Sequence, residues 1–329
     1  MQSILQQIND PELNKVVGCI KKDWSDKLIP RYFKRKSEKL SKYDPDLLWL
    51  LMYSCDYSKG TLDYLDLNYK NFRQVLDAGF ASKIVSKGKF NAHVWEMILC
   101  DVLSSYGTLI PKEQAGADIL LKYEQDKIVQ IEAVTPNEAT DPKLQSVKPV
   151  FDDDNFFGHS GKINDMELPI VLRFLQGFDK KAEKGYEGDK PLIIAVNTGL
   201  VVGMTSNDDH VLRQALFGLG CHQITRHSDG TDSYGFEQMP KLDKGGGEFP
   251  VARFRDENYS HVSGVIYSSQ KPHSLTPYGY GWSNSGLVYV PNPMAKYPVK
   301  IDFDCMRTII VTNEKYEDRG IQKEFKSSL

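Results

Sequence analysis

The chain has 329 residues, of which 40% are hydrophobic, 26% charged and 11% aromatic. A chain of this length and composition can bury a sizeable core, which argues against a disordered or low-complexity protein. The net charge of −3 argues against a protein that coats nucleic acid over its whole surface. A local basic face could still contact a phosphate backbone.

The sequence contains no apolar run that approaches the roughly 20 residues needed to span a bilayer. Its start, Met1-Gln2-Ser3, lacks the basic and apolar regions of a secretory signal. We therefore expect a cytoplasmic protein with no membrane partner. The cysteines are odd in number and widely spaced, so neither a disulfide framework nor a paired-cysteine zinc site is expected. They are Cys19, Cys55, Cys100, Cys221 and Cys305.

The amino-terminal part of the chain is expected to be helical. Apolar residues recur at helical spacing in residues 4–20 and 47–52. Asp44-Pro45 supplies a cap followed by a proline at the first helical position. We expect a helical region over residues 1–88 and a second domain, with a carboxy-terminal extension, over residues 89–329.

Basic residues gather in this region between Lys21 and Lys39, interleaved with Trp24, Tyr32 and Phe33. Solvated helix faces are the more frequent origin of such runs. A contact with a DNA backbone is the alternative, because basic residues hold phosphates and aromatic rings pack against the nucleic acid.

The clearest amphipathic helix is predicted over residues 90–106. Its apolar stripe consists of Val94, Ile98, Val102 and Leu103. Gly107 is expected to end the helix, since glycine commonly follows the last helical turn. Glu96 lies near the start of this helix and is the first candidate site residue.

Strand-like segments follow the helix. They comprise residues 108–110, 118–123, 128–134, 191–197, 261–268 and 287–290. The second and third of these are close enough to form a hairpin. A second helix is expected over about residues 168–184, after an exposed loop at 149–165. This alternation of strands and helices predicts an α/β fold with a mixed central sheet flanked by helices.

The predicted hairpin carries two acidic residues in apolar surroundings. Asp118 enters the strand 118–123, and Glu132 lies within the apolar strand that follows. An isolated buried carboxylate is strongly disfavoured, so both require compensation. A divalent cation would provide it, because carboxylate oxygens suit Mg²⁺ or Mn²⁺.

The register of the hairpin decides whether the two carboxylates can meet. An even turn within residues 124–127 pairs Asp118 with Ala133 and sends Glu132 to the other face. An odd loop or a bulge places Asp118 opposite Glu132 or Val134, on one shared face. The acidic site therefore requires an odd loop or a bulge. Gln130, two residues before Glu132, would line the same face.

At this point the sequence resembles the PD-(D/E)XK nuclease-like superfamily. That family has a helix bearing a glutamate, a strand beginning with aspartate, and a strand carrying Glu-x-Lys. Trp95-Glu96 matches the helix, Ala117-Asp118 the aspartate, and Glu132-Ala133-Val134 the third element. The resemblance covers roughly residues 90–200 and implies a restriction-endonuclease-like fold.

Two residues depart from the family pattern. Ala117 replaces a proline, whereas Val134 stands where the family has a lysine that orients or activates water. In variants of the superfamily a basic residue of the following helix supplies this charge. Arg173, Gln176 and Lys180 share one face of the predicted helix here.

The resemblance implies a metal-dependent nuclease that hydrolyses phosphodiester bonds, with DNA as the substrate and a role in restriction or antiviral defence. Asp118, Glu132 and Glu96 would hold Mg²⁺ or Mn²⁺. Arg173 or Lys180 would stabilise developing negative charge. The chain would act as a homodimer or with a defence-complex partner. The alternative is a catalytically inactive nuclease-fold module that binds nucleic acid or a protein.

Each candidate residue also has a structural interpretation. Taken alone, Glu96 is better explained as a solvated first-turn glutamate that the helix dipole favours, and only its combination with Asp118 and Glu132 favours a shared site. Asp118 is explained by a cap of the turn after Gly116. Arg173 is explained by a structural ion pair with Glu132, which would give an inactive descendant of the family.

Other motifs carry less chemistry. Cys221, His222 and His227 lack the spacing of a zinc site. The glycine run 245–247 lacks the lysine of a phosphate loop. The aromatic stretch 277–285 could stack bases, but loop packing is its default explanation.

Overall fold

The computed structural model places ten stretches of the chain. The structure describes residues 11, 42–52, 56–111, 116–136, 163–184, 189–201, 208–243, 247–276, 286–312 and 316–321. Several expectations therefore fall outside the described residues. They concern the helix at 4–20, the basic run at 21–39, the aromatic stretch at 277–285 and residues 149–162 of the loop expected at 149–165. The last residues of that loop, 163–165, are instead helical.

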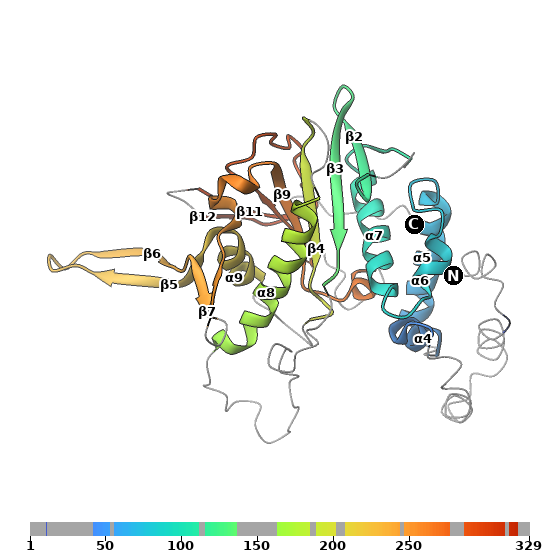
Figure 1. Cartoon of the computed structure of the whole chain (residues 1–329), viewed down its shortest axis with the longest axis horizontal. Helices are drawn as coiled ribbons and strands as arrows, with labels where there is room; N and C mark the ends of the chain where they lie inside the picture. The colour runs from blue at the N-terminus through green and yellow to red at the C-terminus, as the bar shows by residue number, and fades with distance from the viewer. Residues whose placement is uncertain are drawn as a thin grey trace, which may run out of the picture. The chain divides into compact units, whose positions relative to one another are not determined.

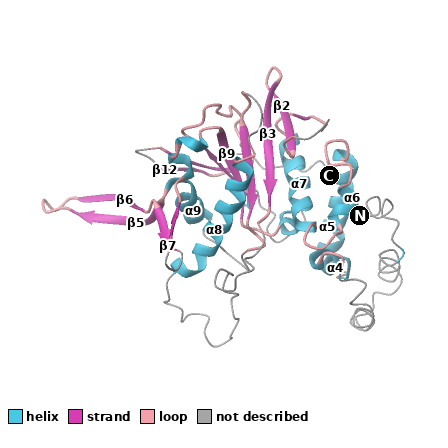
Figure 2. Ribbon diagram, viewed as in Figure 1, coloured by secondary structure: helices cyan, strands magenta, loops and turns pink. Residues whose placement is uncertain are grey.

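The protein is mixed α/β, with an eight-stranded mixed sheet flanked by helices, as expected from the alternation of elements (Figures 1 and 2). The chain divides into two compact units. The first comprises residues 1–133, 271–286 and 323–329, and the second residues 134–270 and 287–322. The expected boundary after residue 88 lies inside the first unit, between two of its helices.

The first unit contains four described helices, a single-turn 3-10 helix and three strands of the sheet. They are α4 (Pro45–Met52), α5 (Asp56–Phe72), α6 (Phe80–Ile84), α7 (Phe90–Ser104), η5 (Pro272–Leu275), β1 (Thr108–Leu109), β2 (Ile119–Tyr123) and β3 (Lys127–Val134). β2 pairs antiparallel with both β1 and β3. The helix expected at 90–106 and the hairpin expected at 118–134 are thus confirmed.

Asp44 organises the start of two helices in this unit. One carboxylate oxygen accepts a hydrogen bond from Asp46 N at 3.0 Å, which caps α4, and the other accepts from Phe90 N at 3.3 Å at the start of α7. Burial raises the pKa of Asp44, and these backbone donors oppose the shift. The expected cap followed by Pro45 is confirmed.

Gly107 does not end α7 in the way expected. The helix stops at Ser104 and its cap residue, Ser105, keeps right-handed helical dihedrals. Gly107 instead lies against β2, where a Cβ would collide with the carbonyl oxygen of Lys122. The glycine is therefore required by a close approach of two backbones rather than by a left-handed cap.

The second unit holds the other strands of the sheet, two small antiparallel ribbons and the remaining helices. Its elements are α8 (Ile163–Ala182), β4 (Leu192–Asn197), α9 (Asp208–Leu212), η2 (Arg213–Phe217), β5 (Leu219–Arg226), β6 (Asp232–Gln238), β7 (Lys241–Asp243), β8 (Glu248–Pro250), η3 (Arg253–Arg255), η4 (Glu257–Tyr259), β9 (Val262–Ser268), β10 (Val288–Pro291), β11 (Arg307–Val311) and β12 (Tyr316–Arg319). The sheet order within this unit is β4-β9-β10-β11-β12. Parallel and antiparallel neighbours alternate along it.

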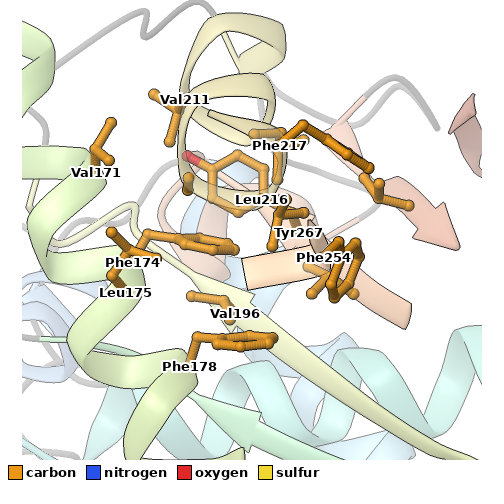
Figure 3. Packing of buried hydrophobic residues seen from close by; sticks show 14 of the residues in the cluster. Val171, Phe174, Leu175, Phe178, Val196, Val211, Leu216, Phe217, Phe254 and Tyr267 are labelled. Carbon is orange, nitrogen blue, oxygen red and sulfur yellow. The ribbon is translucent and has the colours of Figure 1, made fainter. Parts of the chain in front are cut away.

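The core of the second unit forms where α8 covers strands β4 and β9 (Figure 3). Every residue of both strands is buried, which explains the apolar runs at residues 192–196 of β4 and 265–267 of β9. Phe174 of α8 packs edge-on against Tyr267 of β9, with ring centroids 5.7 Å apart. Phe178, one turn later, meets Phe254 edge-on at 6.1 Å. The strands expected at 191–197 and 261–268 are confirmed.

An ion pair also lies within this unit. Arg253 donates to Asp179 through Nε at 2.8 Å and through Nη2 at 2.7 Å, and Tyr259 donates to the same carboxylate at 2.9 Å. The arginine is almost fully buried. The pKa of Arg253 is raised overall: burial is the largest single influence and lowers it, but the hydrogen bonds to Asp179, the charge of Asp179 and the nearby Tyr259 and Asp256 together outweigh burial.

The sequence analysis did not anticipate β5 and β6, β7 and β8, or the edge strands β11 and β12. β5 and β6 form a long ribbon that projects from its unit (Figure 1). Among the residues placed by the structure, no helix is long and apolar enough to cross a membrane.

Candidate functional site

The hairpin of β2 and β3 has the odd loop that the acidic site requires. Tyr123 pairs with Lys127, so three residues form the loop. Gln125 and Asp126 within it have φ angles of 45° and 75°, and Lys127 N closes the turn on Glu124 O at 3.1 Å. Three-residue hairpin loops commonly contain left-handed residues of this kind.

This register is the one that favours Asp118 and Glu132 as neighbours. The pairing of β2 and β3 ends at Ile119 and Ile131, and one further regular step would set Asp118 opposite Glu132. Residues directly opposite in an antiparallel pair point to the same face. The register therefore has the parity that the acidic site requires, and a slip by one residue would favour opposite faces for Asp118 and Glu132.

The Asp118 carboxylate also replaces a backbone carbonyl as the acceptor of a hydrogen bond between the strands. In a strand, the backbone groups of successive residues point alternately to the two neighbouring strands. Leu120 O accepts a hydrogen bond from Ile110 N on the β1 side. The backbone groups of the residues before and after Leu120 therefore point to β3. Continued regularly, the ladder would direct Ala133 N at the carbonyl of Ala117. Ala133 N instead donates to Asp118 Oδ2 at 2.9 Å. Asp118 thus ends the strand pairing, which supports its structural interpretation as well.

Burial differs between the two faces of the hairpin. Ile119, Leu121, Val129 and Ile131 fill the core face. On the other face Glu132 is 0% exposed, whereas Asp118 and Gln130 are half-buried. Gln130 shares the face of Glu132, as expected, and pairs with Leu120.

Glu96 lies elsewhere in its unit, on the seventh residue of α7. Its Oε1 is 3.4 Å from His93 Nδ1, one turn earlier. The first turn of α7 holds no acidic residue, so the helix dipole does not explain Glu96. Burial raises the pKa of the Cys100 thiol, and the negative charge of Glu96 adds to the shift. The sequence analysis missed His93, although its spacing of three from Glu96 is a helical neighbour spacing.

The expected three-carboxylate cluster does not form within the described ranges. There, no group of three or more histidine, cysteine, aspartate or glutamate residues is placed to hold a metal ion. The register of the hairpin favours Asp118 and Glu132 as neighbours, and Glu96 lies beside His93. Arg173 and Lys180 lie on α8 in the second unit, where Arg173 Nη1 donates to Gln176 Oε1 at 2.7 Å.

Two carboxylates at positions 118 and 132 would fit a magnesium-type ion as a partial ligand set. Like charges directly opposite on paired strands are destabilising, so a cation between them lowers the free energy of the pair. Mg²⁺ is often bound by only one or two carboxylates, with waters and substrate phosphates as the other ligands. The donor set suits such an ion and does not suit zinc, which prefers nitrogen and sulfur ligands.

The cysteine and histidines considered for zinc are placed on the β5–β6 ribbon with other partners. His222 stacks on Phe236 with centroids 4.3 Å apart, and His227 Nε2 lies 2.9 Å from Ser233 Oγ. Cys221 is exposed. No family model, curated protein or solved structure matches the chain.

Proposed function

We propose that the protein is a metal-dependent nuclease that hydrolyses phosphodiester bonds, with DNA as its substrate and restriction or phage defence as its role. One observation carries the proposal. The hairpin that carries Asp118 and the fully buried Glu132 has a three-residue loop, and this loop gives the register that the site needs. A cation bound between the two carboxylates would offset the cost of bringing like charges together.

Each residue of the pair would have a definite task. Glu132 and Asp118 would hold Mg²⁺ or Mn²⁺, and the N–H of Ala133 would fix the orientation of the Asp118 carboxylate. When bound, such an ion polarises a phosphodiester and lowers the pKa of a water nucleophile. Gln130 lies beside Glu132 and could position that water by a hydrogen bond.

A second candidate function is a nuclease-fold module without turnover that binds nucleic acid or a protein partner. Two observations favour it. Val134 occupies the position of the family's lysine, and Arg173, its expected replacement, is hydrogen-bonded to Gln176. Both candidates use the same fold and differ in whether a divalent ion supports cleavage.

Cleavage by wild type and by Glu132→Gln separates the candidates. Plasmid, single-stranded DNA and RNA are incubated with magnesium, manganese or chelator. Wild type is expected to cut DNA with either metal, and the variant to lose at least about a thousandfold in rate. The amide preserves the shape of Glu132 but removes the charge that holds the ion.

Glu124→Gln is the matched control, because Glu124 lies in the loop of the same hairpin, is exposed and pairs with Lys127. It should cut like wild type. Val134→Lys should raise the rate of cleavage if the site has kept its geometry. If wild type cuts none of the substrates with either metal, and neither metal shifts its melting temperature, the inactive module is the better description.

A further inference from the structure

The ribbon of β5 and β6 carries an apolar pair on one exposed face. Three large hydrophobic side chains are exposed among the described residues, and two of them, Ile224 at 67% and Tyr234 at 78%, are direct cross-strand partners. The pairing continues on this face with His222 opposite Phe236 and with Arg226 opposite Asp232. These three cross-strand pairs form a stripe along one face of the ribbon. It begins with the rings of His222 and Phe236 at the base, continues with the apolar pair and ends with the ion pair near the tip.

The opposite face of the ribbon has a different character. It carries Gln223 opposite Gly235 and Thr225 opposite Ser233. These side chains are small or polar, so this face needs no cover. The asymmetry indicates that one face of the ribbon is built for contact and the other for solvent.

The base of the ribbon is anchored on its own unit. The Arg213 guanidinium lies 4.8 Å from the Phe236 ring centroid and 5.4 Å from that of Tyr316, and Phe236 and Tyr316 lie 5.6 Å apart. The apolar pair beyond this base has no such neighbours, since both side chains are largely exposed. An isolated two-stranded ribbon is marginally stable in water, so cover from a partner would stabilise it.

The charges of the ribbon argue against nucleic acid as that partner. Between Leu219 and Gln238 the sequence has one arginine and no lysine. It has three acidic residues in the same stretch, Asp229, Asp232 and Glu237. A surface that neutralises phosphates needs an excess of lysine and arginine, which this ribbon lacks.

The face is complementary to itself. A two-fold axis along the ribbon lays β5 of one copy over β6 of the other, because the rotation exchanges cross-strand partners. Ile224 of one copy then meets Tyr234 of the other. Arg226 of one copy meets Asp232 of the other, so the ion pairs at the tip match in sign.

We propose that this face of the β5–β6 ribbon binds a second copy of the chain. A few cross-strand pairs bury much less than a standard interface of about 800 Å² per partner. Association is therefore a concentration-dependent equilibrium between monomer and dimer. The inference is independent of the proposed function, since it requires neither metal nor nucleic acid.

Sedimentation velocity of the full chain measures this equilibrium from about 1 to about 300 µM, a range that brackets micromolar dissociation constants. A reducing agent is present because Cys221 is exposed and could form a disulfide. Wild type is expected to move from monomer to dimer over the range. Ile224→Glu and Tyr234→Glu should each raise the dissociation constant at least about tenfold.

Thr225→Glu and Ser233→Glu are the matched controls. They add the same charge one residue along each strand, where the side chains lie on the opposite face of the ribbon. They should leave the dissociation constant within about twofold of wild type. A wild type that stays monomeric throughout, or equal effects on the two faces, overturns the proposal. So does a monomer whose binding to a DNA duplex is lost in Ile224→Glu, which would make nucleic acid the partner.

Discussion

Two carboxylates inside the fold have opposite surroundings. Asp179 of α8 accepts two hydrogen bonds from Arg253 and one from Tyr259. Glu132 of β3 is more deeply buried, and the register of its hairpin favours a second carboxylate, that of Asp118, beside it. Asp179 is held by hydrogen-bond donors of the fold. The proposed function assigns Glu132 to a bound cation, which would offset the repulsion between two neighbouring carboxylates.

The largest effect on stability is expected where the structural carboxylate is removed. Asp179→Ala leaves the buried Arg253 without its partner and should lower the free energy of unfolding by about 3 to 5 kcal/mol. Denaturant melts followed by circular dichroism measure the loss. Glu132→Gln should cost less than this, since it removes a repulsion. If the two variants lose equal stability, the contrast between the carboxylates is wrong.

The sequence was sufficient for elements whose apolar residues follow a clear period or run. The helix α7, the hairpin β2–β3 and the buried strands β4 and β9 were predicted on that basis. For the site, the sequence predicted only the condition under which it could form. Register parity required an odd loop, but no pattern in the sequence shows that Gln125 and Asp126 adopt positive φ angles, which non-glycine residues rarely do.

Other parts of the fold have no local signal. The β5–β6 ribbon has little apolar alternation because both of its faces are largely exposed. Arg253 and Asp179 are 74 residues apart, so their pairing depends on tertiary packing. Arg173 was expected to need an acidic partner, yet a neutral neighbour on its own helix, Gln176, accepts its hydrogen bond.

A third buried ionisable group extends the comparison to pH. Burial lowers the pKa of His273 to about 4; the charge of Lys271 adds to the shift and that of Asp46 opposes it. His273 shares a hydrogen bond with Asn91 Oδ1 at 3.2 Å. As the pH falls below the ordinary histidine pKa of about 6.5, His273 becomes protonated in the unfolded chain but stays neutral in the folded chain.

Stability is therefore expected to fall between about pH 6.5 and pH 4, by up to a few kcal/mol. His273→Gln should flatten this part of the profile, because glutamine does not titrate and can still donate to Asn91. Melting temperatures of both proteins at half-unit pH steps measure the difference. Parallel profiles for wild type and variant would show that His273 does not titrate differently in the two states.

Metal binding gives the next effect in size. At a concentration of about 100 times its dissociation constant, an ion that binds only the folded chain stabilises it by about 2.7 kcal/mol. Manganese or magnesium should therefore raise the melting temperature of wild type by several degrees. Glu132→Gln should lose this increase, and Asp179→Asn should keep it from a lower starting temperature. An equal metal response in Glu132→Gln would remove Glu132 from the ligand set.

The smallest effect separates the two roles of Asp118. Its carboxylate accepts the hydrogen bond of Ala133 N, and in the proposed site its charge would lie beside that of Glu132. Asp118→Asn keeps an acceptor oxygen and removes the charge, so in metal-free buffer its melting temperature should equal or slightly exceed that of wild type. Asp118→Ala removes both and should cost about 1 kcal/mol, as the loss of a comparable cap does.

Both Asp118 variants should lose the metal-induced increase in melting temperature, because neither retains the ligand's charge. If Asp118→Asn is as unstable as Asp118→Ala in metal-free buffer, the charge of Asp118 stabilises the fold and some donor compensates it. Asp118 would then resemble Asp179, and the hairpin would have no electrostatic need for a cation. If Asp118→Asn is instead the more stable of the two variants and does not respond to manganese, Asp118 has two separable roles. Its acceptor oxygen ends the strand pairing, and its negative charge binds the metal.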